Sequence, residues 1–173
     1  MIENVYVEKE YYDNGKLSMK TPYINGKKNG IRRRYFYTGE LKYEIPYING
    51  EKNGVMKRYD KFRNLIKESS YENNKKNGIE KKYYESGALK YKTPYESGEK
   101  NGIEKGYYES GNLEYKTPYE NDSKNGVVKE YYKSGALKSE TLYENGMASD
   151  IKKEYYESGK LKSENWLFRL FDI

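Results

Sequence analysis

Hydrophobic and polar residues alternate along short stretches of this chain, and most of these stretches end at a glycine-containing turn. In the stretch IEKKYY, Ile79, Lys81 and Tyr83 share one side of an extended chain. In the stretch LKYKTPY, residues 89–95, every second residue is apolar, aromatic or β-branched. A period of two with such residues is typical of β-strands. We therefore predict two strands in this segment.

Two kinds of turn separate the predicted strands. The first is Glu85-Ser86-Gly87, a three-residue hairpin loop whose last position needs a positive φ that glycine adopts without a Cβ clash. The second contains Asn-Gly, as in Asn25-Gly26, Asn49-Gly50 and Asn145-Gly146. A helix would have to accommodate several glycines in every unit, and each glycine destabilises a helix. Each unit is therefore predicted to run strand, turn, strand, turn.

The unit recurs every 24 residues. The stretch KNGIEKKYYESGALKYKTPY, residues 76–95, returns as KNGIEKGYYESGNLEYKTPY, residues 100–119. Such a period indicates a repeat architecture. Glycines and leucines keep it along the chain: Gly30, Gly54, Gly78, Gly102 and Gly126; Leu17, Leu41, Leu65, Leu89, Leu113, Leu137 and Leu161.

These patterns predict an all-β fold, an elongated single-layer twisted antiparallel β-sheet of tandem hairpin repeats. About seven repeats with roughly fourteen strands occupy residues 1–164, each repeat contacting only its neighbours. In a simple hairpin Tyr83 faces Leu89, Lys81 faces Tyr91, and Ile79 faces Thr93. These six residues are then predicted to share one face of the sheet.

The C-terminal residues 165–173, NWLFRLFDI, break the pattern and include the one tryptophan. We expect a short apolar capping segment here, because a terminal repeat exposes an apolar face that needs covering. A membrane anchor is the alternative, but the segment is shorter than the ~18 apolar residues that span a bilayer.

The unit N-G-I-x-K-x-Y-Y-x-[SN]-G-x-L-K-x-x-x-x-Y-x-N-G resembles the MORN-type repeat, in the bacterial variant with a Tyr-Tyr pair before the glycine turn. The resemblance covers nearly all of residues 5–164. It implies hairpins laid side by side and a role in interaction rather than catalysis. Bacterial members are described as antitoxin-like partners of toxins, and eukaryotic relatives as membrane- or lipid-associated scaffolds.

Two units depart from the repeat. In the third, Asp60 replaces the second aromatic residue and Arg63 replaces the turn glycine. Near the C-terminal end, Met147-Ala148-Ser149-Asp150 lacks the Lys-Asn-Gly sequence. Drift in a redundant array explains both departures, and a special contact made by the third unit is the alternative.

Composition narrows the possible functions. Tyrosine, at 23 residues, replaces most of the usual aliphatic core, while only 35% of residues are hydrophobic. The absence of cysteine and histidine excludes disulfides, thiolate chemistry, His-based triads and most zinc sites.

No secretory signal opens the sequence, so we expect a cytoplasmic protein. Carboxylates recur at the turn tips, as in Glu85 and Glu109, without convergent partners, and we expect no enzyme, cofactor or metal site.

A column of basic residues interleaved with aromatic rings is the candidate partner-binding site. A basic residue lies three positions after each repeat glycine, and a tyrosine lies two positions further on. An anionic partner fits such a column, but lysine stems that simply cover tyrosine rings give the same pattern. A denser basic patch lies within residues 27–34. The candidate residues are Lys27, Lys28, Arg32, Arg33, Arg34, Tyr35, Lys57, Tyr59, Lys81, Tyr83, Lys105, Tyr107, Lys129 and Tyr131.

The sequence therefore predicts a non-enzymatic protein-binding module, an inhibitor or antitoxin-like protein that blocks a partner protein. The expected partner is acidic or associated with nucleic acid, for example a toxin or an RNA-guided defence nuclease. The net charge of +6 is modest beside 27 acidic residues, which weakens direct nucleic-acid binding. Direct binding of anionic membrane lipid or nucleic acid, and a purely structural scaffold, are the alternatives. The oligomeric state stays open.

Overall fold

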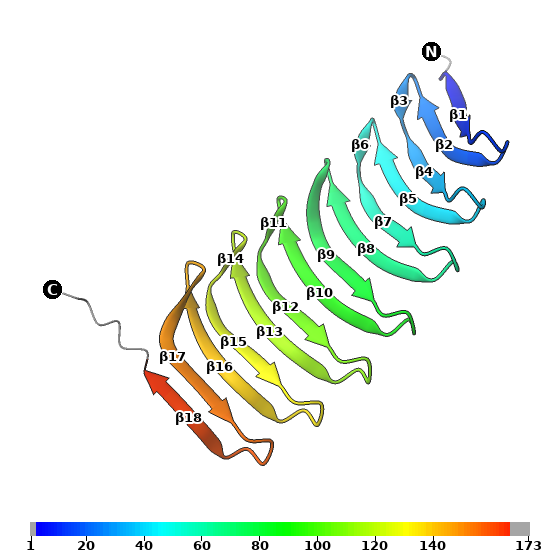
Figure 1. Ribbon diagram of the computed structural model, residues 1–173. Helices are drawn as coiled ribbons and strands as arrows, with labels where there is room; N and C mark the ends of the chain where they lie inside the picture. The colour runs from blue at the N-terminus through cyan, green and yellow to red at the C-terminus, as the bar shows by residue number, and fades with distance from the viewer. Residues whose placement is uncertain (1–2, 167–173) are drawn as a thin grey trace. The chain divides into compact units, whose positions relative to one another are not determined.

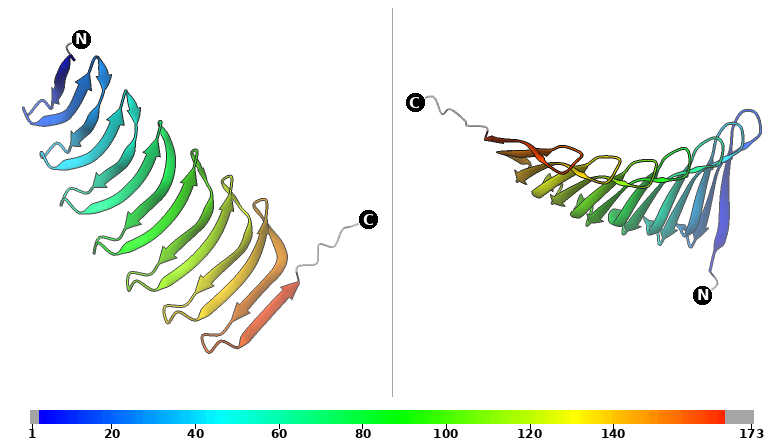
Figure 2. Two further views of the ribbon diagram at one scale, coloured as in Figure 1. Left: turned by 180° about the vertical axis from the view of Figure 1, so that it is seen from behind. Right: turned by 90° about the horizontal axis from the view of Figure 1, so that it is seen from below.

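The computed structural model describes residues 3–166, and this part of the chain is all-β. Fourteen long strands and four two-residue strands form antiparallel hairpins in an open single layer (Figures 1 and 2). The prediction of a single-layer antiparallel sheet of hairpin repeats is confirmed. Within residues 3–166 there is no helix that is long and apolar enough to cross a membrane. Most of the predicted cap, residues 167–173, lies outside the described residues.

The chain forms two compact units. Among the described residues, unit 1 comprises residues 3–87 and Tyr95–Gly98, and unit 2 comprises Ala88–Pro94 and residues 99–166. The strands of unit 1 are β1 (Val5–Tyr11), β2 (Leu17–Ile24), β3 (Lys27–Lys28), β4 (Gly30–Tyr35), β5 (Leu41–Ile48), β6 (Glu51–Lys52), β7 (Gly54–Tyr59), β8 (Leu65–Glu72) and β9 (Lys75–Tyr83).

Unit 2 repeats the same arrangement. Its strands are most of β10 (Leu89–Glu96), then β11 (Glu99–Lys100), β12 (Gly102–Tyr107), β13 (Leu113–Glu120), β14 (Ser123–Lys124), β15 (Gly126–Tyr131), β16 (Leu137–Glu144), β17 (Met147–Tyr155) and β18 (Leu161–Trp166).

The turns have the predicted chemistry. Gly87 has φ +85°, and its amide donates to the Tyr84 carbonyl oxygen at 3.0 Å. Asn25 and Gly26 both have positive φ, at 51° and 76°, as the mirror-image two-residue hairpin turn requires.

The third repeat builds the same turn without glycine. Arg63 adopts φ +70° at the glycine position. The Asp60 side chain accepts hydrogen bonds from the backbone amides of Phe62, at 2.8 Å, and Asn64, at 2.9 Å. Local side-chain bonds of this kind stabilise tight turns. The two departures of this repeat therefore act together: a positive φ is unfavourable for Arg63, and the hydrogen bonds to Asp60 stabilise the turn that requires it.

A β-bulge near the turn of the hairpins changes which residues share a face. In the β12–β13 hairpin Tyr107 pairs with Leu113, as the repeat predicts. The register then shifts by one residue, so that Lys105 pairs with Lys116, and Gly106 with Tyr115. The same shift occurs in the β1–β2, β4–β5, β7–β8, β15–β16 and β17–β18 hairpins.

The predicted pairing beyond the turn is therefore wrong. Lys105, the equivalent of Lys81, was expected opposite Tyr115, and Ile103 opposite Thr117; Ile103 in fact pairs with Pro118. One extra residue in the second strand moves all the following side chains to the other face. The bulge thus divides the predicted single set of residues between two faces of the layer.

We call one face the packed face. In β12 and β13 it carries Glu104, Gly106, Tyr115 and Thr117, and it contains the buried side chains. Its buried residues are mostly small and polar: Thr21, Ser69, Thr93, Thr117, Ser139, Glu80, Glu104 and the ring of Tyr47. The other face carries the cross-strand row of charged residues described below, and we call it the ladder face.

Candidate functional site

The packed face is organised around buried glutamates. Glu80 is only 4% exposed. Its carboxylate forms ion pairs with Lys67, at 3.0 Å, and Lys76, at 2.6 Å, and accepts a hydrogen bond from the Ser69 hydroxyl at 3.0 Å. Burial alone would raise the pKa of Glu80, but the hydrogen bonds from Lys76 and Lys67 outweigh it and hold the pKa below its ordinary value. The charge of Glu80 is therefore compensated inside the sheet.

Glu104 has the same position in unit 2. It accepts hydrogen bonds from the Thr93 hydroxyl at 2.7 Å, the Lys100 ammonium at 2.9 Å and the Tyr115 hydroxyl at 3.3 Å. The Tyr115 ring lies over Gly106, where a Cβ would come within 2.0 Å of the ring. Burial and the Glu104 carboxylate raise the pKa of Tyr115. A side chain at residue 106 would therefore displace the Tyr115 ring from its present position.

A row of lysines covers tyrosine rings on the packed face. Each of these lysines follows the second turn of a repeat and lies over the ring of a tyrosine in the next repeat. The ammonium-to-centroid distances are 4.2–5.4 Å, in cation–π range. The pairs are Lys28–Tyr47, Lys52–Tyr71 and Lys76–Tyr95 in unit 1, and Lys100–Tyr119 and Lys124–Tyr143 in unit 2.

The sequence interpretation missed this lysine–tyrosine row, although the 24-residue spacing of the lysines was available. The second aromatic residue of each pair also has a structural role. The Tyr108 hydroxyl donates to the Tyr131 carbonyl oxygen at 2.7 Å, and the Tyr132 hydroxyl to that of Tyr155 at 2.8 Å. These bonds tie each repeat to the next one.

The ladder face carries a row of charged residues in direct cross-strand register. In unit 1 the row runs Lys9, Lys20, Arg33, Glu44, Lys57, Glu68 and Lys81. In unit 2 it runs Lys92, Lys105, Lys116, Lys129, Glu140, Lys153 and Glu164. We call this row the ladder. The predicted basic column supplies every second member, and the sequence interpretation missed the members between.

The intervening residue decides whether the ladder is neutralised. Glu44 pairs with Arg33 at 3.0 Å and also accepts a hydrogen bond from the Tyr59 hydroxyl at 3.1 Å. Glu140 pairs with Lys129 at 2.7 Å and accepts from the Tyr155 hydroxyl at 3.1 Å. At these sites a carboxylate sits between a cation and a phenol.

Glu68 makes the same kind of contact. The Tyr83 hydroxyl donates to its carboxylate at 2.7 Å, and Lys81 lies 3.8 Å away. Burial, followed by this hydrogen bond and the carboxylate charge, raises the pKa of Tyr83 to about 12. The predicted lysine–tyrosine column is therefore joined through glutamates in this stretch, which we call the glutamate segment (Arg33, Glu44, Lys57, Glu68 and Lys81).

The ladder in unit 2 begins with four consecutive lysines, of which the last, Lys129, is bound to Glu140. Lys105 pairs directly with Lys92 on one side and with Lys116 on the other. Among the described residues no ion pair joins any of the first three to a carboxylate. The Lys116 ammonium lies 5.8 Å from the centroid of the Tyr131 ring. We call Lys92, Lys105 and Lys116 the lysine segment.

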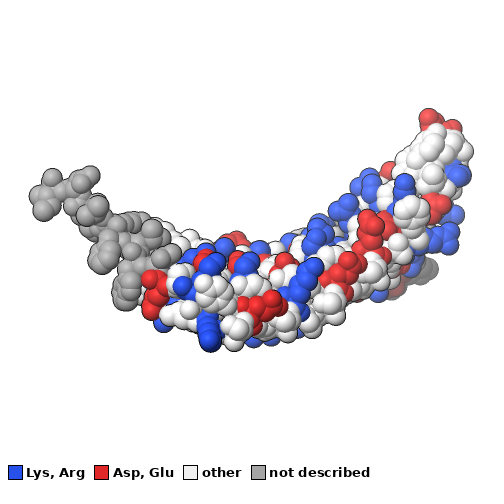
Figure 3. Space-filling model, turned by 60° about the horizontal axis from the view of Figure 1, so that its bottom comes forward, with Lys and Arg blue, Asp and Glu red and all other residues white. Residues whose placement is uncertain are grey.

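The predicted basic patch at residues 27–34 does not form one surface. Arg33 belongs to the ladder, whereas Arg32 packs its guanidinium on the Met19 sulfur and Arg34 pairs with Met19 across the strands, both on the packed face. Lys28 covers Tyr47 on that same face. Both signs of charge lie side by side over the surface in Figure 3. Lys27, at the turn end of β3, is exposed.

Beside the ladder runs a line of exposed β-branched residues, which we call the apolar strip. In six hairpins one lies two residues before the ladder lysine or arginine of the first strand, and their exposed fractions are 39–50%. Most of them pair with a proline or leucine of the next strand. The strip consists of Val7, Ile31, Val55 and Ile79 in unit 1, and Ile103 and Val127 in unit 2.

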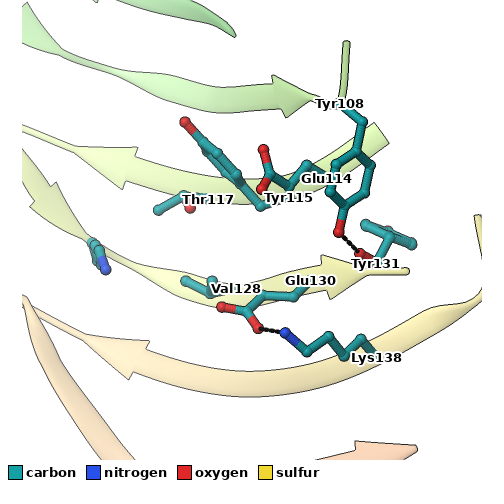
Figure 4. A pocket seen from close by; sticks show the side chains of 9 residues that line it. Tyr108, Glu114, Tyr115, Thr117, Val128, Glu130, Tyr131 and Lys138 are labelled. Atoms are coloured by element: carbon teal, nitrogen blue, oxygen red, sulfur yellow. Dashed lines mark hydrogen bonds and ion pairs between the residues drawn. The ribbon is translucent and has the colours of Figure 1, made fainter. Parts of the chain in front are cut away.

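A recess of about 210 Å³ opens on the packed face of unit 2 (Figure 4). Its lining includes Tyr108, Glu114 and Tyr115, and a Glu130–Lys138 ion pair at 3.6 Å. Glu130 also accepts a hydrogen bond from Ser139. Tyr108 donates to the Tyr131 carbonyl oxygen and Tyr115 to Glu104, and no group of acidic residues within residues 3–166 could hold a metal ion. We assign no chemistry to this recess.

Comparisons with known proteins bear on the repeat. The family described as the MORN repeat variant matches residues 7–25, 28–49, 76–97, 100–121, 124–145 and 151–165. The repeat containing Asp60 and Arg63 falls between two of these matches. No curated protein matches the chain.

Among solved structures, the crystal structure of TarM is similar to 54% of this chain, with 18% sequence identity and a TM-score of 0.38. The match covers 20% of the TarM chain. MORN repeat proteins are generally binding or structural modules, and the family match takes in most of the sequence. The chain therefore belongs to the MORN repeat variant family.

Proposed function

We propose that this protein is a non-enzymatic, inhibitor- or antitoxin-like module that blocks a partner protein by covering it with the ladder face. The observation that carries the proposal is the apolar strip. All six of its residues are 39–50% exposed, although each lies within a strand of a well-formed sheet. Contiguous exposed apolar side chains rimmed by polar ones are typical of protein interaction surfaces.

The two faces support the choice of the ladder face. Hydroxyl, lysine and glutamate groups on the packed face already bind one another around Glu80 and Glu104. On the ladder face Ile103 and Val127 have their neighbouring ladder residues on one side and solvent above. A partner that covers these side chains removes apolar surface from water, which is the main driving force of association.

Affinity capture with the tagged full chain tests this proposal. The double variant Ile103→Thr with Val127→Thr keeps β-branched residues in the strands while removing apolar surface. We expect it to weaken binding of a stoichiometric protein partner roughly tenfold. The control is Phe62→Thr, which removes a 73% exposed apolar side chain from a turn and should leave binding unchanged.

Inhibition is measured separately, as the activity of the captured partner with and without the chain. Failure to recover any stoichiometric protein partner would contradict the proposal. Equal loss in the double variant and in Phe62→Thr would also contradict it, because binding would then not depend on the ladder face. Capture of nucleic acid or lipid in place of protein would favour the direct-binding alternatives.

A further inference from the structure

The lysine segment is unfavourable for the fold. Like charges directly opposite each other on neighbouring strands destabilise a sheet, and Lys105 has a lysine opposite it on both sides. In the repeats of the glutamate segment, the corresponding positions hold Glu44 and Glu68. Local violations of this kind are typical of functional sites.

The molecule itself shows which group fits beside these lysines. In unit 1 the Glu44 carboxylate lies between the Arg33 guanidinium, at 3.0 Å, and the Tyr59 hydroxyl, at 3.1 Å. Unit 2 has Lys105 in place of Arg33, Tyr131 in place of Tyr59, and Lys116 in place of the glutamate. The cation and the phenol are kept, and the carboxylate between them is missing from the chain.

We propose that the lysine segment binds carboxylates of an acidic protein partner, which complete the ladder in place of the missing glutamate. This inference rests on the proposed function and specifies the chemistry of the partner. Neighbouring strands lie about 4.8 Å apart, so the three lysines span roughly 10 Å. Alternate side chains of an extended acidic segment are about 7 Å apart, which places two carboxylates within reach of three ammonium groups.

The surroundings of the lysine segment favour protein over nucleic acid. Single-stranded nucleic acid binds where bases stack on exposed aromatic rings between basic groups. Here the Lys116 ammonium lies over the Tyr131 ring, and Tyr115 lies on the packed face. The exposed neighbours are instead Ile103 and Val127 of the apolar strip. An acidic surface with apolar side chains matches both features.

A smaller run of the same kind occurs in unit 1. Lys20 pairs with Lys9 and with Arg33, but Arg33 is bound to Glu44. The lysine segment of unit 2 is thus the longer stretch of ladder without a carboxylate, and it gives the sharper test.

The test measures binding of a fluorescent poly-L-glutamate peptide to the full chain by anisotropy. The double variant Lys105→Gln with Lys116→Gln is compared with Lys57→Gln and Lys81→Gln in the glutamate segment. Each pair removes two positive charges from the ladder, and glutamine introduces no like charge. We expect the first pair to weaken peptide binding roughly tenfold and the second to change it less than about twofold.

Three results would overturn the inference: no binding of the peptide, an equal loss in both double variants, or tighter and equally lysine-dependent binding of an oligothymidylate of the same charge. The proposed function has a separate readout. If the protein partner is still captured through Ile103 and Val127 while the lysine substitutions have no effect, the inference fails and the proposed function stands. If that capture fails too, both are wrong.

Discussion

The packed face and the ladder face use the same kinds of residue in different ways. On the packed face, Glu80 is 4% exposed and is surrounded by two lysines and a serine, so its charge contributes to cohesion. On the ladder face, glutamates alternate with cations in one stretch and are replaced by lysines in another. A one-residue bulge places these two sets of charged residues on opposite faces of the sheet.

The largest expected effect comes from overfilling the packed face. Gly106→Val would place a Cβ within 2.0 Å of the Tyr115 ring, and we expect a loss of about 3 kcal/mol in the free energy of unfolding. Valine is otherwise the better strand residue, so the sign of the effect is informative. The measurement is the midpoint of urea unfolding. Lys105→Val, on the adjacent ladder residue, is the control, and an unchanged or higher midpoint for Gly106→Val would contradict the arrangement.

A smaller loss is expected from Glu80→Gln. The variant removes a buried charged group that accepts from three donors, and we expect the free energy of unfolding to fall by about 2 kcal/mol. Glu68→Gln on the ladder face should lower it by about 0.5 kcal/mol. Because the folded pKa of Glu80 is lowered, its contribution is present above the ordinary value near 4.5 and is lost as the pH falls through the folded pKa.

Urea unfolding as a function of pH measures this contribution. The stability difference between the wild type and Glu80→Gln should be full near neutral pH and should shrink as the solution becomes acidic below pH 4.5. A difference that is independent of pH across this range would refute the charged role of Glu80.

The smallest effect, with opposite sign, concerns the ladder. Lys116→Glu would replace two like-charge pairs, with Lys105 and Lys129, by opposite-charge pairs, and we expect stabilisation of about 0.5 kcal/mol. The reverse change, Glu68→Lys, should destabilise by a similar amount. Equal destabilisation by both substitutions, seen in the same urea titrations, would show that register in the ladder has no energetic consequence.

The sequence predicted the repeat, the hairpins and the single-layer sheet, because the 24-residue period, the turn glycines and the strand alternation are local signals. It also identified the basic column, including Lys105 and Lys129. It did not predict the residues that lie opposite that column, because the bulge at Glu114 changes the register by one residue. Periodicity alone does not reveal such a bulge. The second-strand residues predicted to share a face with Lys105, such as Tyr115 and Thr117, therefore lie on the opposite face.

Two further features depended on geometry. Arg32 and Arg33 are adjacent in sequence, but successive residues of a strand point to opposite faces, so the predicted basic patch is divided between them. The sequence alone does not show that the two departures of the third repeat are coupled, with Asp60 supporting the positive φ of Arg63. Side-chain bonds of this type are visible only once the turn is built.

Cross-linking of paired cysteines tests the separation of the two faces most directly, since the natural chain has no cysteine. Residues that face each other across strands can form a disulfide, whereas side chains that point to opposite faces cannot. After mild oxidation, Lys105→Cys with Lys116→Cys should lose both free thiols within the monomer, and Lys105→Cys with Tyr115→Cys should keep them. The opposite outcome would place Lys105 and Tyr115 on one face and contradict the account.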